Sequence, residues 1–158
     1  MINVLFVCAG NICRSPMAEA VFQHMVNEAG LSDQIQSDSA GTGDWHVGEL
    51  AHVGTRNVLK KHNIPYNGRA RQFIQRDLSQ FDYVVVMDAA NMRGVERYIR
   101  PDDRAKVHMF LEFANTAATT PVKEVPDPYY DGRFDEVYDL VTLGAAALLA
   151  HIRAEHNL

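Results

Sequence analysis

Cysteine is scarce in this sequence: only Cys8 and Cys13 occur among 158 residues. Two cysteines are too few for a disulfide framework, and without neighbouring histidines they are too few for a structural zinc site. The sequence therefore predicts no structural zinc site, and we also expect no other metal and no cofactor. Each thiol therefore either takes part in a reaction or is simply buried as an apolar side chain.

The sequence also lacks an excess of basic residues and any apolar run of about 18 residues. Its 15 Lys and Arg face 20 Asp and Glu, whereas an electrostatic nucleic-acid binder is normally basic. The first residues lack the basic region and the small-residue cleavage site of a signal peptide. We expect no nucleic-acid partner, no membrane association and a cytoplasmic location.

No internal repeat, linker or low-complexity tract divides the chain, so we expect one domain over residues 1–158. We also expect a monomer or weak dimer. Apolar runs predict strands at residues 2–7, 35–39, 83–87 and 106–111. Helical periodicity predicts helices at residues 16–29, 53–62, 91–99 and 134–152. Strands that alternate with helices are typical of a parallel α/β sheet.

The start of the first helix carries clear signals. Ser15 is a good N-cap, Pro16 suits the first helical position, and Gly30 follows where a helix should end. The preceding strand ends at Cys8, so only a short polar loop separates the strand from the helix.

This loop, Cys8-Ala9-Gly10-Asn11-Ile12-Cys13-Arg14-Ser15, is the most informative segment of the sequence. Between a strand and a helix N-terminus, its backbone N–H groups can form a nest for a tetrahedral anion. Arg14 offers a planar fork for two phosphate oxygens, and the same positive field would hold Cys8 as a thiolate. A Cys and an Arg six positions apart also arise by chance, but this placement favours phosphoryl transfer through a cysteinyl-phosphate.

The wider segment, residues 4–20, closely resembles the low-molecular-weight protein tyrosine phosphatases. Three later segments, residues 38–42, 82–91 and 126–132, resemble the same family in order and spacing. The resemblance implies a four-stranded parallel sheet in the order 2-1-3-4, helices on both faces and a phosphate-binding loop after the first strand. It also implies metal-independent hydrolysis of phosphotyrosine in proteins and of small aryl phosphates.

Hydrolysis needs an acid, because the leaving oxygen must be protonated as its bond to phosphorus breaks. Asp127 lies on a stiff loop between Pro126 and Pro128, and the resemblance assigns it as general acid and then as base; the alternative is an ordinary turn residue. We assign that turn role to Asp131. Asp88 resembles the family's second carboxylate near the acid, although a helix N-cap is an equally good interpretation.

Three residues resemble those that support the loop in the family. The hydroxyl of Ser15 would donate a hydrogen bond to the Cys8 sulfur, and Ser15 would also cap the helix. Asn11 and Ser39 look like a bracing pair, with Asn11 in a left-handed conformation; ordinary turn chemistry is the alternative. Many relatives add a His where this chain has Gly68, which puts the rigidity of the loop in doubt.

Substrate choice should depend on the rim of the site. Trp45, Tyr129 and Tyr130 are candidates for aromatic walls around a phenyl phosphate, or else half-buried loop anchors. Similar proteins that favour phosphoarginine tend to carry a Thr where this chain has Ile12. We therefore expect phosphotyrosine.

Cys13 has two interpretations, either a small apolar filler against the first strand or a redox partner of Cys8. Family members with the same pair favour the second, in which a Cys8–Cys13 disulfide protects the nucleophile from overoxidation.

Two other functions compete with hydrolysis. Thioredoxin-coupled arsenate reduction needs further cysteines, and none follows Cys13. A catalytically silent phosphate-binding module would not need Cys8, Arg14 and Asp127 together.

Overall fold

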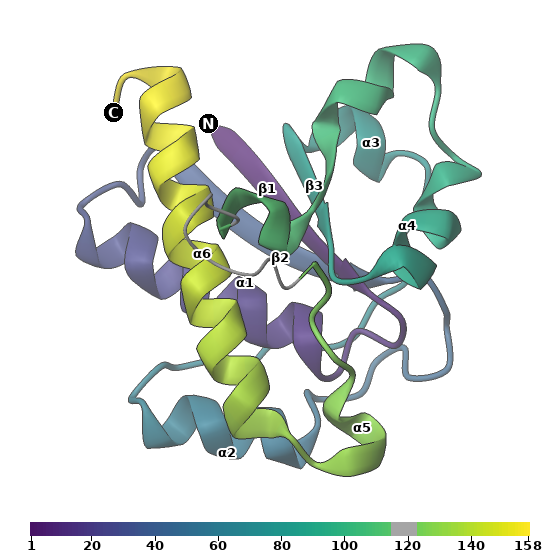
Figure 1. Cartoon of the computed structure of the whole chain (residues 1–158), viewed down its shortest axis with the longest axis vertical. Coiled ribbons are helices and arrows are strands. Elements are labelled where there is room, and N and C mark those ends of the chain that lie inside the picture. The colour runs from purple at the N-terminus through teal and green to yellow at the C-terminus, as the bar shows by residue number, and fades with distance from the viewer. Residues whose placement is uncertain (115–122) are drawn as a thin grey trace.

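The computed structural model describes residues 1–114 and 123–158, and its centre is a four-stranded parallel sheet in the order β2-β1-β3-β4 (Figure 1). This is the predicted order. The strands are β1 (Ile2–Cys8), β2 (Ile35–Gly41), β3 (Tyr83–Val86) and β4 (Val107–Met109).

Helices cover both faces of the sheet, as expected (Figure 1). One face packs against α1 (Arg14–Glu28), α2 (Val53–Lys61) and α6 (Phe134–His156). The other packs against α3 (Asp77–Gln80) and α4 (Ala89–Glu96). The remaining elements are the short helix α5 (Pro128–Asp131) and the 3-10 helices η1 (Pro101–Lys106) and η2 (Phe110–Ala114).

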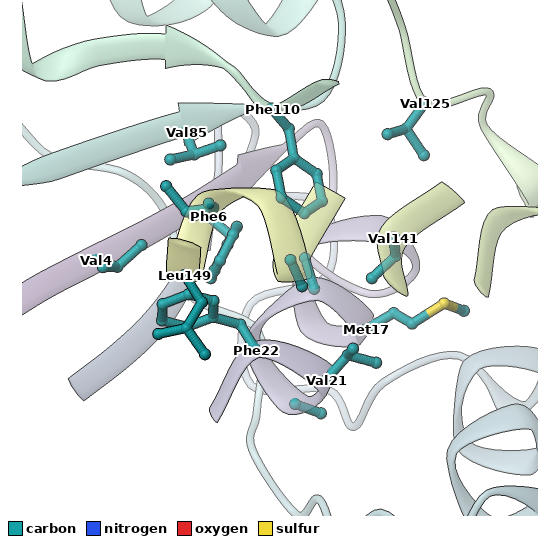
Figure 2. Packing of buried hydrophobic residues seen from close by; sticks show 14 of the residues in the cluster. Val4, Phe6, Met17, Val21, Phe22, Val85, Phe110, Val125, Val141 and Leu149 are labelled. Atoms are coloured by element: carbon teal, nitrogen blue, oxygen red, sulfur yellow. The ribbon is translucent and has the colours of Figure 1, made fainter. Parts of the chain in front are cut away.

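The central strand β1 divides its side chains between two buried clusters, because successive residues of a strand point to opposite faces. Phe6 joins the cluster beneath α1 and α6, whereas its neighbours Leu5 and Val7 join the cluster beneath α3 and α4. The Phe6 ring meets Phe22 and Phe110 edge-on, with ring centres 5.5 and 5.4 Å apart (Figure 2). This packing fixes β1, and therefore the loop that follows it.

Helix α6 is long and apolar enough to cross a membrane by length and composition alone. Its stripe of Val141, Ala145, Leu148 and Ile152 is fully buried in the core cluster that also contains residues of α1 and η2. The apolar composition of α6 is therefore that of a core helix.

Several predicted boundaries were wrong by a few residues. β4 is shorter than the predicted residues 106–111, because the chain turns into η2 at Phe110. α4 begins before the predicted residue 91, because the Asp88 side chain caps it at its start, and it ends at Glu96, before the predicted residue 99. The short helices α3 and α5 were not predicted, since four residues carry too little periodicity to reveal a helix.

Candidate active site

The site lies where the sheet order reverses direction, between β1 and its neighbour β3. In parallel sheets the carboxyl ends of such strands leave a crevice that binds ligands. A cavity of about 340 Å³ opens there. It is bordered by residues 8–10 and 12–14 of the loop at residues 8–15, called the phosphate loop below. Segments far along the chain complete it: the pair Trp45 and His46, and the residues Asp127, Tyr129 and Tyr130.

The phosphate loop presents unused backbone donors. Among the described residues, the N–H groups of residues 10–13 donate to no protein acceptor. The loop runs directly into α1, whose first N–H groups have no partner within the helix. Such a row of free donors beside a positive helix end is suited to an oxyanion.

Cys8 ends β1 at the base of this cavity and is 3 % exposed. Its Sγ lies 3.0 Å from Ser15 Oγ. The predicted N-cap role of Ser15 was wrong: α1 begins at Arg14, and Cys13 occupies the N-cap position without a side-chain capping bond. Because the loop closes directly into the helix, Ser15 lies within the first turn, and its buried hydroxyl faces Cys8 and Asn11 instead.

Asn11 adopts the predicted left-handed conformation, with φ 58°. Its Nδ2 donates to Ser15 Oγ at 2.8 Å and to Ser39 Oγ at 2.9 Å, and its Oδ1 accepts from the Arg71 backbone N–H at 2.9 Å. Gly41 permits this packing, because a Cβ there would lie 2.8 Å from the Ala9 carbonyl oxygen. The amide of Asn11 therefore links the loop to β2 and to the segment before α3.

Arg14 is almost fully buried, and one side of its guanidinium is already occupied. Its Nη1 donates to Asp88 Oδ2 at 2.6 Å and to the Val125 carbonyl at 3.0 Å. Asp88 also caps α4 by accepting from the Asn91 N–H at 2.7 Å, so both interpretations of Asp88 describe its contacts. The Nε and Nη2 edge of Arg14 makes no hydrogen bond within the described chain and is left to contact a ligand.

The charge of Arg14 is stabilised by its neighbours. Burial alone would lower the pKa of Arg14, but Cys8, Asp88 and Asp127 together raise it above the ordinary value. The guanidinium is therefore a permanent positive charge at the cavity wall.

Asp127 is extended, with φ -85° and ψ 112°, and caps α5 by accepting from the Tyr129 N–H through Oδ1 at 3.1 Å. Its Oδ2 lies 3.6 Å from Arg14 Nη2. One oxygen is thus held by the backbone while the other lies beside the arginine. Asp131 pairs instead with Arg133 and does not border the cavity.

Two residues of the aromatic rim are more exposed than half-buried loop anchors would be, whereas the third, Tyr129, is 45 % exposed. Trp45 is 69 % exposed and Tyr130 88 % exposed, and both border the cavity with Tyr129. His46 was missed by the sequence analysis: its Nδ1 is 2.9 Å from Glu49 Oε2, and its ring packs against Gly10. The only signal for His46 was its position next to Trp45.

Cys13 is a buried, free thiol, as is Cys8. It packs with Ile12 and Ala70, next to Phe134, and not against the first strand as the filler interpretation supposed. The Cys13 carbonyl accepts from the Thr55 hydroxyl on α2 at 3.0 Å, so the Cys13 backbone is held beside α2. Burial, and then the nearby Cys8, raise the pKa of Cys13 to about 12.

Comparison with known proteins agrees with this geometry. The model of the family "low molecular weight phosphotyrosine protein phosphatase" matches residues 3–158. The chain is 42 % identical to the low molecular weight protein-tyrosine-phosphatase YfkJ of Bacillus subtilis, and the match covers 100 % of both chains. It is 40 % identical to the phosphatase PtpA of Staphylococcus aureus, over 100 % of this chain and 98 % of PtpA.

Solved structures give the same result. The crystal structure of YfkJ superposes with a TM-score of 0.92, covering 98 % of this chain and 96 % of YfkJ. The Drosophila arginine phosphatase DARP superposes with a TM-score of 0.85 at 30 % identity, covering 95 % of this chain and 97 % of DARP. The chain therefore belongs to the low molecular weight phosphotyrosine protein phosphatase family.

Proposed function

We propose that this phosphatase hydrolyses phosphotyrosine in proteins, and small aryl phosphates, through a cysteinyl-phosphate on Cys8. One observation carries the proposal: Cys8, Arg14 and Asp127 border a single cavity whose floor is a loop with unused N–H donors. A nucleophile, an anion clamp and a proton donor are the groups that phosphate transfer to sulfur requires.

In the first step, the Cys8 thiolate attacks phosphorus as the phosphate oxygens lie against the loop N–H groups and the free edge of Arg14. A sulfur–phosphorus bond forms and the bond between phosphorus and the phenolic oxygen breaks. Asp127 gives its proton to that oxygen, so the substrate leaves as a neutral phenol. Asp127 borders the same cavity as Cys8, and its Oδ2 lies beside the arginine that would hold the phosphate, so its position favours this role.

In the second step, Asp127, now a carboxylate, takes a proton from water, and the water oxygen attacks phosphorus. The sulfur–phosphorus bond breaks, inorganic phosphate forms and Cys8 returns to the thiolate. Ser15 Oγ lies 3.0 Å from the sulfur, and its hydroxyl would donate a hydrogen bond that stabilises the departing thiolate. Asn11, Ser39 and Asp88 support the loop and the arginine without taking part in bond changes.

The positive charge for this chemistry comes from Arg14, the loop N–H groups and the N-terminus of α1. We therefore expect activity without an added metal.

The rim favours a flat aromatic substrate, because Trp45, Tyr129 and Tyr130 surround the cavity entrance. Phosphoarginine is a second candidate, since one structural neighbour is an arginine phosphatase. Ile12 borders the cavity and is bulkier than the Thr expected in phosphoarginine-specific relatives, so we favour phosphotyrosine.

The test compares wild type with Cys8→Ser on p-nitrophenyl phosphate, a phosphotyrosine peptide and a phosphoarginine peptide, each with and without EDTA. We expect wild type to hydrolyse the first two in EDTA and Cys8→Ser to hydrolyse none. Substantial turnover by Cys8→Ser would show that Cys8 is not the nucleophile. Activity lost in EDTA and restored by a divalent ion would contradict the metal-independent mechanism, and a preference for phosphoarginine would replace the substrate assignment.

We also propose a redox role for Cys13. Peroxide would oxidise the Cys8 thiolate to a sulfenic acid, and the Cys13 thiol would then displace water from it to form a disulfide. Both thiols border the same cavity. Because the charge of Cys8 raises the pKa of Cys13, its conversion to a neutral sulfenic acid removes one barrier to ionisation of Cys13.

A further inference from the structure

The proposed mechanism does not use one half-buried carboxyl group behind the phosphate loop. Glu19, on α1, accepts a hydrogen bond from Ser39 Oγ at 2.6 Å and another from the Tyr66 hydroxyl at 3.0 Å. Ser39 in turn accepts from the side chain of Asn11. The carboxyl group of Glu19 is therefore connected to the loop that holds Cys8.

The direction of these hydrogen bonds follows from counting protons. Asn11 has two N–H protons on its amide, and it donates one to Ser15 and one to Ser39. The hydroxyl proton of Ser39 is then directed to Glu19, its acceptor at 2.6 Å. The hydroxyl proton of Ser15 is directed to the Cys8 sulfur at 3.0 Å, since its other acceptor, the Ala40 carbonyl, is 3.5 Å away. The network thus runs outward from Asn11 to two acceptors, the carboxyl of Glu19 and the sulfur of Cys8.

Gly68 makes room for the outer member of this network. A Cβ at position 68 would overlap the hydroxyl and ring of Tyr66. Tyr66 itself is half buried and packs against the main core cluster, so its hydroxyl cannot move aside freely while it bonds Glu19. The residue that weakened the sequence-based case for a rigid loop is the residue that lets Tyr66 reach Glu19.

We propose that Tyr66 and Glu19 are positioning residues, which keep the Ser15 hydroxyl directed at Cys8 through Ser39 and Asn11. The proposal rests on the proposed role of Cys8 as the nucleophile. Tyr66 supplies a donor that stabilises the ionised form of Glu19, and the carboxylate fixes the proton of Ser39. With that proton fixed, both N–H groups of Asn11 are committed, and Ser15 has only the sulfur as a close acceptor.

The charges around Glu19 determine when it is ionised. Burial raises its pKa to about 7, against the hydrogen bond from Ser39, which lowers it. Asp38 on β2 raises this pKa further, whereas Tyr66 and Arg71 lower it, and His24 lines the same surface cavity. Burial and Glu19 raise the pKa of Tyr66, so its hydroxyl remains a donor at neutral pH. Glu19 is thus a carboxylate acceptor above about pH 7 and a weaker, neutral acceptor below it.

The experiment measures kcat, KM and the pH dependence of kcat on p-nitrophenyl phosphate for wild type, Tyr66→Phe, Gly68→Ala and Glu19→Gln. The same proteins are treated with iodoacetamide across the pH range, which reports the thiolate of Cys8 without turnover. The matched control is Tyr138→Phe, a half-buried tyrosine against the same core whose hydroxyl has no partner among the described residues.

For Tyr66→Phe we expect kcat to fall by about tenfold with KM within about twofold, the lower end of losses for partners that orient a reactive group. The pH dependence of kcat should shift to higher pH, because ionised Glu19 loses a hydrogen-bond donor. The pH dependence of Cys8 alkylation should shift in the same direction. Gly68→Ala should reproduce both shifts, because its methyl displaces the Tyr66 hydroxyl. Glu19→Gln should lose the part of the pH dependence of kcat that arises from ionisation of Glu19 near pH 7. Tyr138→Phe should behave as wild type.

If Tyr66→Phe keeps the kcat and pH dependence of Tyr138→Phe, the proposal is overturned. If Tyr66→Phe does not fold, the result for Glu19→Gln decides. A folded Glu19→Gln with the pH dependence of kcat of wild type overturns the proposal, and loss of the change in kcat near pH 7 supports it. A failure of the proposed function is distinct, because Cys8→Ser would then retain turnover while the Tyr66 comparison could still be made by alkylation.

Discussion

The phosphate loop and the segment at residues 127–130 contribute to the same cavity, but the two regions are built in opposite ways. In the loop, Asn11, Arg14 and Ser15 are at most 3 % exposed, and each is held by side chains from other elements. In the second segment, Asp127 is 37 % exposed and Tyr130 is 88 % exposed.

The difference separates two tasks. The buried loop must hold a charged nucleophile and a charged phosphate at fixed distances, which requires groups whose positions are set by folding. The exposed segment must meet substrates that differ beyond the phosphate and must let the product leave. We therefore expect changes in the loop to act on kcat and on the fold, and changes in the rim to act on KM.

The largest effect should come from Cys8→Ser. The substitution is small and the alcohol is not ionised at neutral pH, so we expect undetectable turnover in a folded protein. Vanadate or phosphate should still bind, because the loop N–H groups and Arg14 remain. Thermal unfolding with and without vanadate checks both points: a variant that no longer gains stability from vanadate would show that the change damaged the loop itself.

Asp127→Asn tests the exposed segment. Asn keeps an oxygen that can cap α5, so the segment should remain in place while the acidic proton is lost. We expect the rate on phosphotyrosine to fall by about 10²–10⁴ and the rate on p-nitrophenyl phosphate to fall less, since p-nitrophenol leaves without protonation.

The measurement compares kcat of wild type and Asp127→Asn on both substrates at a single pH. Equal losses on both substrates, with chemistry rate-limiting, would exclude Asp127 as the proton donor.

Glu19→Gln tests the cost of partly burying a carboxyl group behind the loop. The pKa of Glu19 is about 7 in the folded protein against an ordinary value of 4.5, so the folded state binds a proton that the unfolded state has lost between these pH values. Stability from this group is therefore present at low pH and is lost as the pH rises through 7.

Relative to wild type, Glu19→Gln should gain about 3 kcal/mol of unfolding free energy between pH 4.5 and pH 8, since each pKa unit corresponds to about 1.4 kcal/mol. Urea unfolding at several pH values measures this change. A constant difference between the two proteins would show that Glu19 does not titrate in this range.

Cys13→Ser compares two fates of the same oxidised nucleophile. We expect peroxide to inactivate both proteins, and dithiothreitol to restore wild type but restore Cys13→Ser poorly, with bound phosphate protecting both. Peptide mass spectrometry of oxidised wild type should find a Cys8–Cys13 link. Sulfinic or sulfonic acid on Cys8 without that link would show that Cys13 has no redox role and serves only in packing.

Trp45→Ala should have the smallest effect. The side chain is 69 % exposed, so its loss should leave stability nearly unchanged, and surface substitutions usually stay within about 0.5 kcal/mol. We expect KM for a phosphotyrosine peptide to rise by about tenfold or less, the order of one aromatic contact, with kcat retained. A large loss of kcat would mean that the rim takes part in the chemical step.

Much of the fold and the core of the site could be predicted from the sequence. The apolar run of β1, the polar loop and the periodicity of α1 are local patterns, so they predicted the phosphate loop between a strand and a helix. Asn11 in the left-handed region is local as well, because few other residues tolerate that conformation. Short elements such as α3 and α5 lacked enough residues for such a pattern.

The tertiary structure alone decided what each polar side chain contacts. Ser15 has the sequence context of an N-cap, yet its hydroxyl faces Cys8 because the loop closes directly into the helix. In the sequence, Gly68 stands where many relatives have a supporting His. In the structure, its lack of a Cβ leaves room for the Tyr66 hydroxyl to bond Glu19. Local sequence determines backbone preference and burial, whereas hydrogen-bond partners come from segments distant in the chain, and buried polar groups must bond whichever partner the packing brings near.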